Sequence, residues 1–236
     1  MTATIEPTTV AAGDTAVEPA AEAGRPRWPL FGALAGATAF AGALIGMPSN
    51  LTEDDWSAGV DVIDELERGG FHVAFLLGLV SVAALLVAAS AWKRWAERNA
   101  PDDLAARTIP TALTATATVN IIGYALMGSM ALYLPGGVDE GWLSREAIFV
   151  NFTLLDFGVL LGWWGGMVAA GCVAVLALRR DRVLPRWMGI ASILLMLPAT
   201  LMAVIMALPG FPGFTMPIWL VVISLGMVFS RTAARR

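Results

Sequence analysis

The sequence predicts an all-α fold, a polytopic transmembrane helical bundle with six spans and both termini in the cytoplasm. Hydrophobic residues make up 57% of the 236 residues and charged residues only 14%, whereas soluble domains carry about 25% charged residues. The mean hydropathy is +0.70, so the chain has too few polar side chains to cover a water-facing surface. The apolar residues form continuous stretches without alternation, which favours helices over barrel strands.

The beginning of the chain differs in composition from the rest. Residues 1–24 contain four acids among Ala, Thr and Pro and almost nothing to bury, so we expect a disordered acidic tail. A signal peptide would need a basic start followed closely by an apolar stretch, and this segment has neither. Residues 25–236 are then expected to form a single transmembrane domain.

Six apolar stretches follow this tail. Most of them approach or exceed the ~20 residues with which an α-helix crosses ~30 Å of hydrocarbon. The fourth is long enough to overshoot the hydrocarbon, the sixth is short, and Pro198 predicts a kink in the fifth. The expected spans are about 28–47, 71–92, 108–134, 148–178, 188–208 and 213–230.

The basic residues predict the orientation of the spans. Of the 15 Lys and Arg residues, 13 fall before the first span, after the last, or in the second–third and fourth–fifth connections. Only Arg68 and Arg145 lie on the other side. Under the positive-inside rule both termini are cytoplasmic, and we expect a multi-pass protein of a bacterial plasma membrane. An aromatic belt at the inner boundary is predicted from Trp28, Trp92, Trp95 and Trp187.

The first outer connection, residues 48–70, contains seven acids. Thr52 and Asp55 have the spacing of a helix capping box, and Gly69 and Gly70 predict a helix end. The intervening residues place apolar and acidic side chains on opposite faces, which predicts a short amphipathic helix on the outer bilayer surface. Such a loop could attract a divalent cation or a basic partner, but EF-hand spacing is missing. We therefore favour a solvated acidic face.

The fourth span carries small residues at every fourth position. Gly158, Gly162, Gly166 and Ala170 fall on one helix face, where another helix backbone can approach closely. Packing within the chain is the interpretation that we favour. Contact with a second copy or with another membrane protein is the alternative.

Few polar groups lie inside the spans, and these are the candidate residues for a ligand or proton site. Asp156 is the one acid within an apolar run and His72 is the only histidine; residue counting places both at the outer lip, with Asn151 nearby. Asn120 and Tyr124 continue a polar stripe that begins at Thr116 in the third span. An Asp156–His72 pair would respond to pH near neutrality. In the alternative interpretation, these two side chains reach water separately and Asn120 bonds another helix.

The sequence also limits the classes of function. A net charge of −4 argues against a nucleic-acid partner, and one cysteine and one histidine argue against catalytic and metal motifs and against a cofactor. We expect a non-enzymatic protein of the lipid bilayer that binds a partner, lipid or small ligand through its helices and acidic outer loop. The alternative is a small proton- or ion-coupled transporter, and a membrane-embedded enzyme comes third.

The C-terminal ninety residues carry a family resemblance. The segments LLDFGVLLGWWGG, VLPRWMG and PGFPGFTMPIWLVVISLGMVF resemble a family of bacterial, actinobacterial-type membrane proteins with six helices and a domain of unknown function. The resemblance implies the six-helix topology and implies no activity.

Overall fold

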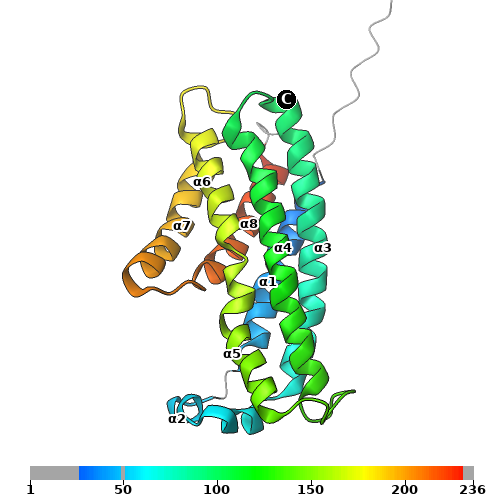
Figure 1. The fold of residues 1–236 in the computed structure, drawn as a ribbon. Helices are drawn as coiled ribbons and strands as arrows, with labels where there is room; N and C mark the ends of the chain where they lie inside the picture. Colours follow the sequence, from blue (N-terminus) through cyan, green and yellow to red (C-terminus); the bar gives the residue numbers. More distant parts are fainter. Residues whose placement is uncertain (1–26, 49–50, 231–236) are drawn as a thin grey trace, which may run out of the picture.

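The fold is that of a computed structural model, which describes residues 27–48 and 51–230, without the side chains at positions 53, 56 and 156–159. The expected acidic tail, 1–24, lies outside the described residues. All regular elements within the described ranges are helical (Figure 1). They are α1 (Pro29–Gly46), α2 (Glu53–Ser57), the 3₁₀ helix η1 (Gly59–Glu65), α3 (Arg68–Asn99), α4 (Leu104–Tyr133), α5 (Arg145–Leu161), α6 (Trp164–Leu178), α7 (Arg186–Met206) and α8 (Pro212–Phe229).

Five of these helices, α1, α3, α4, α7 and α8, are long and apolar enough to cross a membrane. Each agrees with an expected span to within a few residues at its start. The fourth expected span, 148–178, does not form one continuous helix. The structure divides it into α5 and α6, and the division falls at Gly162 and Trp163. The last turn tightens here, because the Trp163 N–H donates to the carbonyl three residues back, on Leu160, at 3.4 Å.

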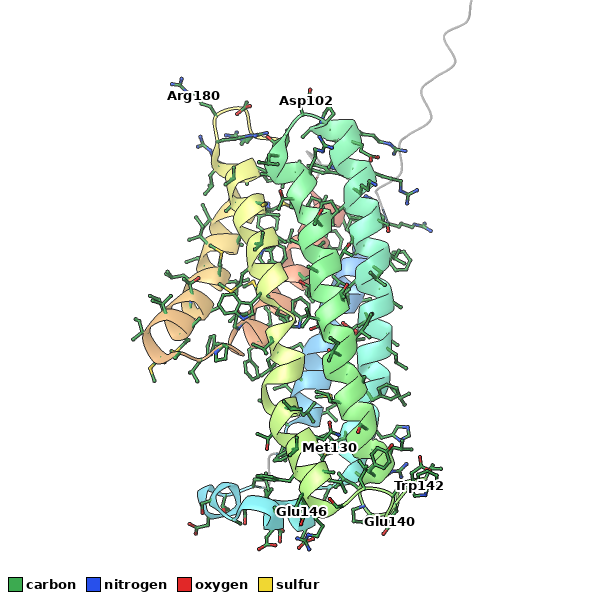
Figure 2. All side chains as sticks on the ribbon, in the orientation of Figure 1. Asp102, Met130, Glu140, Trp142, Glu146 and Arg180 are labelled. Atoms are coloured by element: carbon green, nitrogen blue, oxygen red, sulfur yellow. The ribbon has the colours of Figure 1, made fainter. Side chains whose placement is uncertain are left out.

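The helices pack around α4, which contacts α3 on one side and α5 and α6 on the other. Helix α1 lies between α3 and α8, and α7 closes the arrangement by packing on α6 and α8. Figure 1 shows the α3–α4 and α6–α7 connections at one end of the bundle and α2 with the α4–α5 connection at the other. We call these the basic end and the acidic end; Figure 2 labels Asp102 and Arg180 at the first and Glu140 and Glu146 at the second.

Buried apolar side chains form two clusters, one toward each end of the bundle. Residue Ala117 of α4 belongs to the basic-end cluster and Tyr124 to the acidic-end cluster. Asn120 lies between them on the same helix. A polar residue therefore occupies the boundary between the two halves of the apolar core.

The expected aromatic belt is partly wrong. Trp92 and Trp95 are 2% and 8% exposed, so they belong to the core and do not face lipid. Trp28 packs edge-on against Trp92 with ring centroids 5.6 Å apart, and Trp92 packs edge-on against Trp95 at 5.2 Å. This cluster fastens α1 to α3. Of the four, Trp187 has the exposure that a belt residue needs, at 43%.

The acidic segment between α1 and α3 also differs from the expected single amphipathic helix. Gly59 has a φ of +65°, a left-handed conformation that ends α2 and begins η1. Val62, Ile63 and Leu66 are buried in the acidic-end cluster with residues of α4 and α5. The segment therefore packs on protein. The helix end expected at Gly69 and Gly70 is a helix start, because α3 begins at Arg68.

Candidate functional site

The polar stripe predicted on the third span is buried within the bundle. Thr116 and Asn120 are 0% exposed and Tyr124 is 1% exposed, one turn apart on the face of α4 that meets its neighbours. The Thr116 hydroxyl donates to the carbonyl of Ala112 in its own helix at 3.1 Å. This bond satisfies the Thr116 hydroxyl within its own helix. Asn120 and Tyr124 have no such intrahelical bond.

Asn120 is an unpaired amide in an apolar interior. Neither its Oδ1 nor its Nδ2 has a hydrogen-bond partner. The carboxamide lies against Gly162, where a β-carbon would overlap Oδ1. Glycine at this position thus lets the α5–α6 junction approach the amide of α4. The same close approach recurs one turn later, where a β-carbon on Gly165 would overlap the Ala112 carbonyl oxygen and would lie 3.1 Å from the backbone N of Thr116.

The α5–α6 junction is held from the opposite side by the α7–α8 hairpin. The indole N–H of Trp164 donates to the Pro209 carbonyl at 3.0 Å. Gly210 and Gly213 pack against Leu160, and Trp163 is 1% exposed. The tip of the hairpin therefore reaches the level of the junction, and Asn120 lies on the other side of it.

Tyr124 extends the polar site toward α3. Its ring lies flat against Gly78, where a β-carbon would overlap the ring atoms. The Tyr124 hydroxyl lies beside the Ser81 hydroxyl but makes no hydrogen bond of good geometry. Ser81, one turn along α3 from Gly78, directs its own hydroxyl to the Ala35 carbonyl of α1 at 2.9 Å. The site thus offers an amide without a hydrogen bond and a phenol beside Ser81, and both groups are neutral.

These groups define what the site can bind. An amide and a phenol supply both donors and acceptors but no charge. The described residues contain no group of three His, Cys, Asp or Glu side chains that could hold a metal ion. The arrangement can therefore donate and accept hydrogen bonds without contributing a charge.

The structure distributes the other predicted site residues differently. Asn151 of α5 donates through its amide to the Ser129 hydroxyl of α4 at 2.6 Å, so it joins two helices. His72 is exposed near the start of α3, about 9 Å along the helix from Gly78 by rise per residue. The side chain of Asp156 and the surroundings of Gly158 lie outside what the structure describes. The expected Asp156–His72 pair is therefore still a prediction.

The small-residue face of the fourth expected span has two different partners. Gly162 faces α4, whereas a β-carbon on Gly166 would lie 3.1 Å from the Met216 side chain of α8. Ala170 is 0% exposed. The described part of this face is thus occupied within the chain.

The acidic end contains an ion-pair cluster that occupies two of the seven acids. Arg145, at the start of α5, contacts Asp61 at 3.2 Å and Asp64 at 2.8 Å. Thr52 and Asp55 form the predicted capping box. Backbone and side-chain hydrogen bonds from Thr52 hold the pKa of Asp55 below its ordinary value of 3.8. These contacts give the segment a structural role in fastening η1 to α5.

Sequence reasoning missed one buried polar pair and one ion pair. The indole N–H of Trp219 in α8 donates to the hydroxyl of Ser192 in α7, and Arg179 pairs with Asp103 at the basic end. Asp103 also caps α4 by accepting from the Ala106 N–H at 3.0 Å. Burial raises the pKa of Asp103, but the Ala106 N–H and the Arg179 guanidinium outweigh it and hold that pKa below 3.8. Only the position of Asp103 before an apolar run could have indicated the cap.

Comparison of the chain with protein-family models, curated proteins and solved structures found no match in any of the three.

Proposed function

We propose that this chain is a multi-pass protein of a bacterial plasma membrane, with six crossings and cytoplasmic termini, that binds a small polar ligand inside its bundle. Five helices have the length and composition of membrane spans, and α5 with α6 supplies the sixth crossing. The 13 basic residues assigned to one side support the orientation. In this orientation the basic end faces the cytoplasm.

The observation that carries ligand binding is the unpaired amide of Asn120. A buried amide without a hydrogen bond costs roughly 1–3 kcal/mol, and hydrocarbon contains no water to replace the missing partner. Leucine has nearly the same size and would remove this cost. Asparagine at this position thus lowers the stability of the free protein, which is common for residues of binding sites. The ligand would complete the bonds of Asn120 and of the Tyr124 hydroxyl one turn away.

The first test compares two buried polar side chains in detergent-purified protein. Asn120→Leu should raise the melting temperature of the free protein, because it removes an unpaired polar group. Ser192→Ala is the matched control, since Ser192 is equally buried but accepts from Trp219, and it should lower the melting temperature. If Asn120→Leu destabilises the protein as much as Ser192→Ala does, Asn120 is an ordinary packed residue and the site is refuted.

The second test is a thermal-shift screen of neutral and zwitterionic amides, alcohols and amino acids, with monovalent cations as a separate arm. A compound that stabilises the wild type should leave Asn120→Leu unchanged and should act normally on Ser192→Ala. Equal stabilisation of the wild type and Asn120→Leu would place the ligand elsewhere. A screen in which no compound stabilises the wild type would contradict ligand binding.

The division between α5 and α6 favours a second candidate function, a small proton- or ion-coupled transporter. Secondary transporters place their binding sites where discontinuous helices meet, and Asn120 lies at such a junction. Flux of the identified ligand into proteoliposomes, with and without a proton gradient, would separate transport from binding alone.

A further inference from the structure

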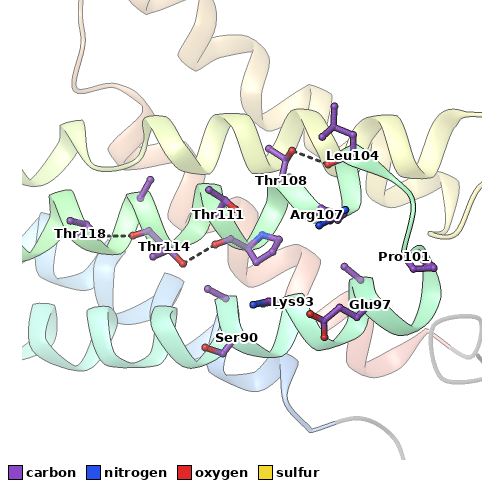
Figure 3. A pocket seen from close by; sticks show the side chains of 14 residues that line it. Ser90, Lys93, Glu97, Pro101, Leu104, Arg107, Thr108, Thr111, Thr114 and Thr118 are labelled. Atoms are coloured by element: carbon purple, nitrogen blue, oxygen red, sulfur yellow. Dashed lines mark hydrogen bonds between the residues drawn. The ribbon is translucent and has the colours of Figure 1, made fainter.

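A second site lies on the outer surface of α3 and α4, on a different face of α4 from Asn120 and reaching toward the basic end. The two helices leave a groove of about 1120 Å³ between them. Figure 3 shows its lining, with Lys93 and Glu97 from α3 and Arg107 from α4 at one end. Thr108, Thr114 and other small side chains continue the groove along α4 toward the middle of the bundle.

The groove differs chemically from the rest of the lipid-facing surface. Elsewhere on α3, large apolar side chains such as Leu76, Leu79 and Leu86 are exposed. Along the groove the residues are mainly alanine, serine and threonine. The Thr108, Thr114 and Thr118 hydroxyls donate to carbonyls of their own helix at 2.8, 2.9 and 3.0 Å. Because those hydroxyls bond their own helix, the α4 side of the groove presents mainly the small methyl groups of these threonines.

The charged end of the groove carries an excess of positive charge. Lys93 and Arg107 oppose a single acid, Glu97, in the lining. The ion pairs of the described residues involve Arg145 and Arg179, so neither Lys93 nor Arg107 has a carboxylate partner there. Lys93 lies about 9 Å along α3 from the end of that helix. Two cations without a partner at this depth favour an anionic group at the level of the lipid headgroups.

The dimensions fit one occupant. From Leu104 to Thr118 the lining extends over 15 residues of α4, about 21 Å of helix between the two ends. Half of the ~30 Å hydrocarbon core is about 15 Å. One leaflet's acyl chain therefore fits along the threonine wall while its phosphate reaches Lys93 and Arg107. We propose that this groove binds an anionic phospholipid of the leaflet at the basic end, with the phosphate between Lys93 and Arg107. The inference rests on the proposed membrane embedding and is independent of the Asn120 site.

The test uses the full chain purified in detergent and examined by native mass spectrometry after addition of phosphatidylglycerol or phosphatidylcholine. The wild type should retain phosphatidylglycerol preferentially. Lys93→Gln and Arg107→Gln should each weaken that retention roughly fivefold. Arg94→Gln is the matched control, because Arg94 is the exposed neighbour of Lys93 but does not line the groove. If Lys93→Gln and Arg94→Gln lose phosphatidylglycerol equally, the retention reflects general surface charge, and the proposed lipid site is refuted.

Two further variants examine the shape and the charge balance of the groove. Ala115→Trp fills the groove and should displace lipid, whereas Ile121→Trp, on another face of α4, should not. Glu97→Gln removes the opposing charge and should tighten binding. Inorganic phosphate alone should neither bind nor compete at millimolar concentration; competition would identify an anion pocket and refute the lipid site. If the protein is extracted from membranes in folded form but retains both lipids equally, this inference alone is refuted. If the protein is instead found in the soluble fraction of the cells, the proposed function is refuted as well.

Discussion

The indole N–H of Trp219 donates to the hydroxyl of Ser192 at 2.8 Å, and this bond joins α8 to α7 inside the hairpin. Ser192 in turn donates to the Met188 carbonyl of its own helix at 2.8 Å. Both side chains are at most 1% exposed. The pair is thus a fully satisfied polar contact in an apolar setting.

Removing the acceptor of this bond should destabilise the protein. Ser192→Ala leaves the buried indole N–H without a partner, and we expect a loss of about 1 kcal/mol, measured as a lower melting temperature in detergent. Ser90→Ala is the control, because the exposed Ser90 hydroxyl bonds only its own helix, at Leu86. Equal melting of Ser192→Ala and the wild type would show that the bond contributes nothing.

Acid should weaken the Asp103–Arg179 contact at the basic end. The pKa of Asp103 is lowered on folding, so its contribution to stability is present above its unfolded pKa and is lost as pH falls through the folded value. The melting temperature should therefore decline as the pH falls below about 4. Asp103→Asn should cost about 1–2 kcal/mol at pH 6 and flatten this decline.

The neighbouring exposed residue provides the control for that prediction. Asp102→Asn changes the same net charge without touching Arg179, and its pH profile should follow the wild type. If Asp103→Asn also follows the wild type, the ion pair does not contribute to stability.

Close packing at the α5–α6 junction predicts sensitivity at Gly162. Gly162→Leu, and even Gly162→Ala, would force a side chain into the Asn120 amide, so both should lower the melting temperature. Gly162 has a φ of −55°, which alanine adopts freely, so the clash is the only cause. Gly171→Ala should be neutral or stabilising, because a β-carbon there meets only the Met196 sulfur at 4.0 Å. Equal melting of the two alanine variants would exclude close packing at Gly162.

The proposed orientation predicts accessibility from the two sides of the membrane. In a chain with Cys172→Ser, a cysteine at Ser57 should react with an impermeant thiol reagent in intact cells. A cysteine at Arg182 should react only after lysis. Both positions are exposed in the structure, so labelling depends on the side of the membrane. The reverse labelling pattern would overturn the orientation.

The helix positions were predictable because long apolar runs between charged connections have few other solutions. The division at Gly162 and Trp163 was not, since no proline or charge marks it. It lies where Asn120 and the hairpin tip, both distant in sequence, contact the junction. Asn120 was identified as a candidate from its residue type and from its place in the polar stripe of the third span. Its lack of a partner could not be predicted, because an amide in a span usually finds another helix.

The burial of Trp92 and Trp95 was missed for a similar reason. A tryptophan near the end of a span has the same local sequence whether it faces lipid or another helix. The contact with Trp28, more than sixty positions away, decides between the two. The groove residues likewise follow no motif, because Lys93 and Arg107 come together only when α3 and α4 pack side by side.

The tip of the α7–α8 hairpin has a consequence for the surrounding bilayer. It meets α5 at Leu160, and from there α5 continues for 14 residues to Glu146, about 21 Å. On that stretch Val150 and Leu154 are 57% and 59% exposed. One flank of the protein therefore has a shorter apolar height than the other. In the proposed membrane setting, such hydrophobic mismatch is relieved by thinning the adjacent leaflet or by tilting the bundle, and we expect the stability of the protein to depend on bilayer thickness.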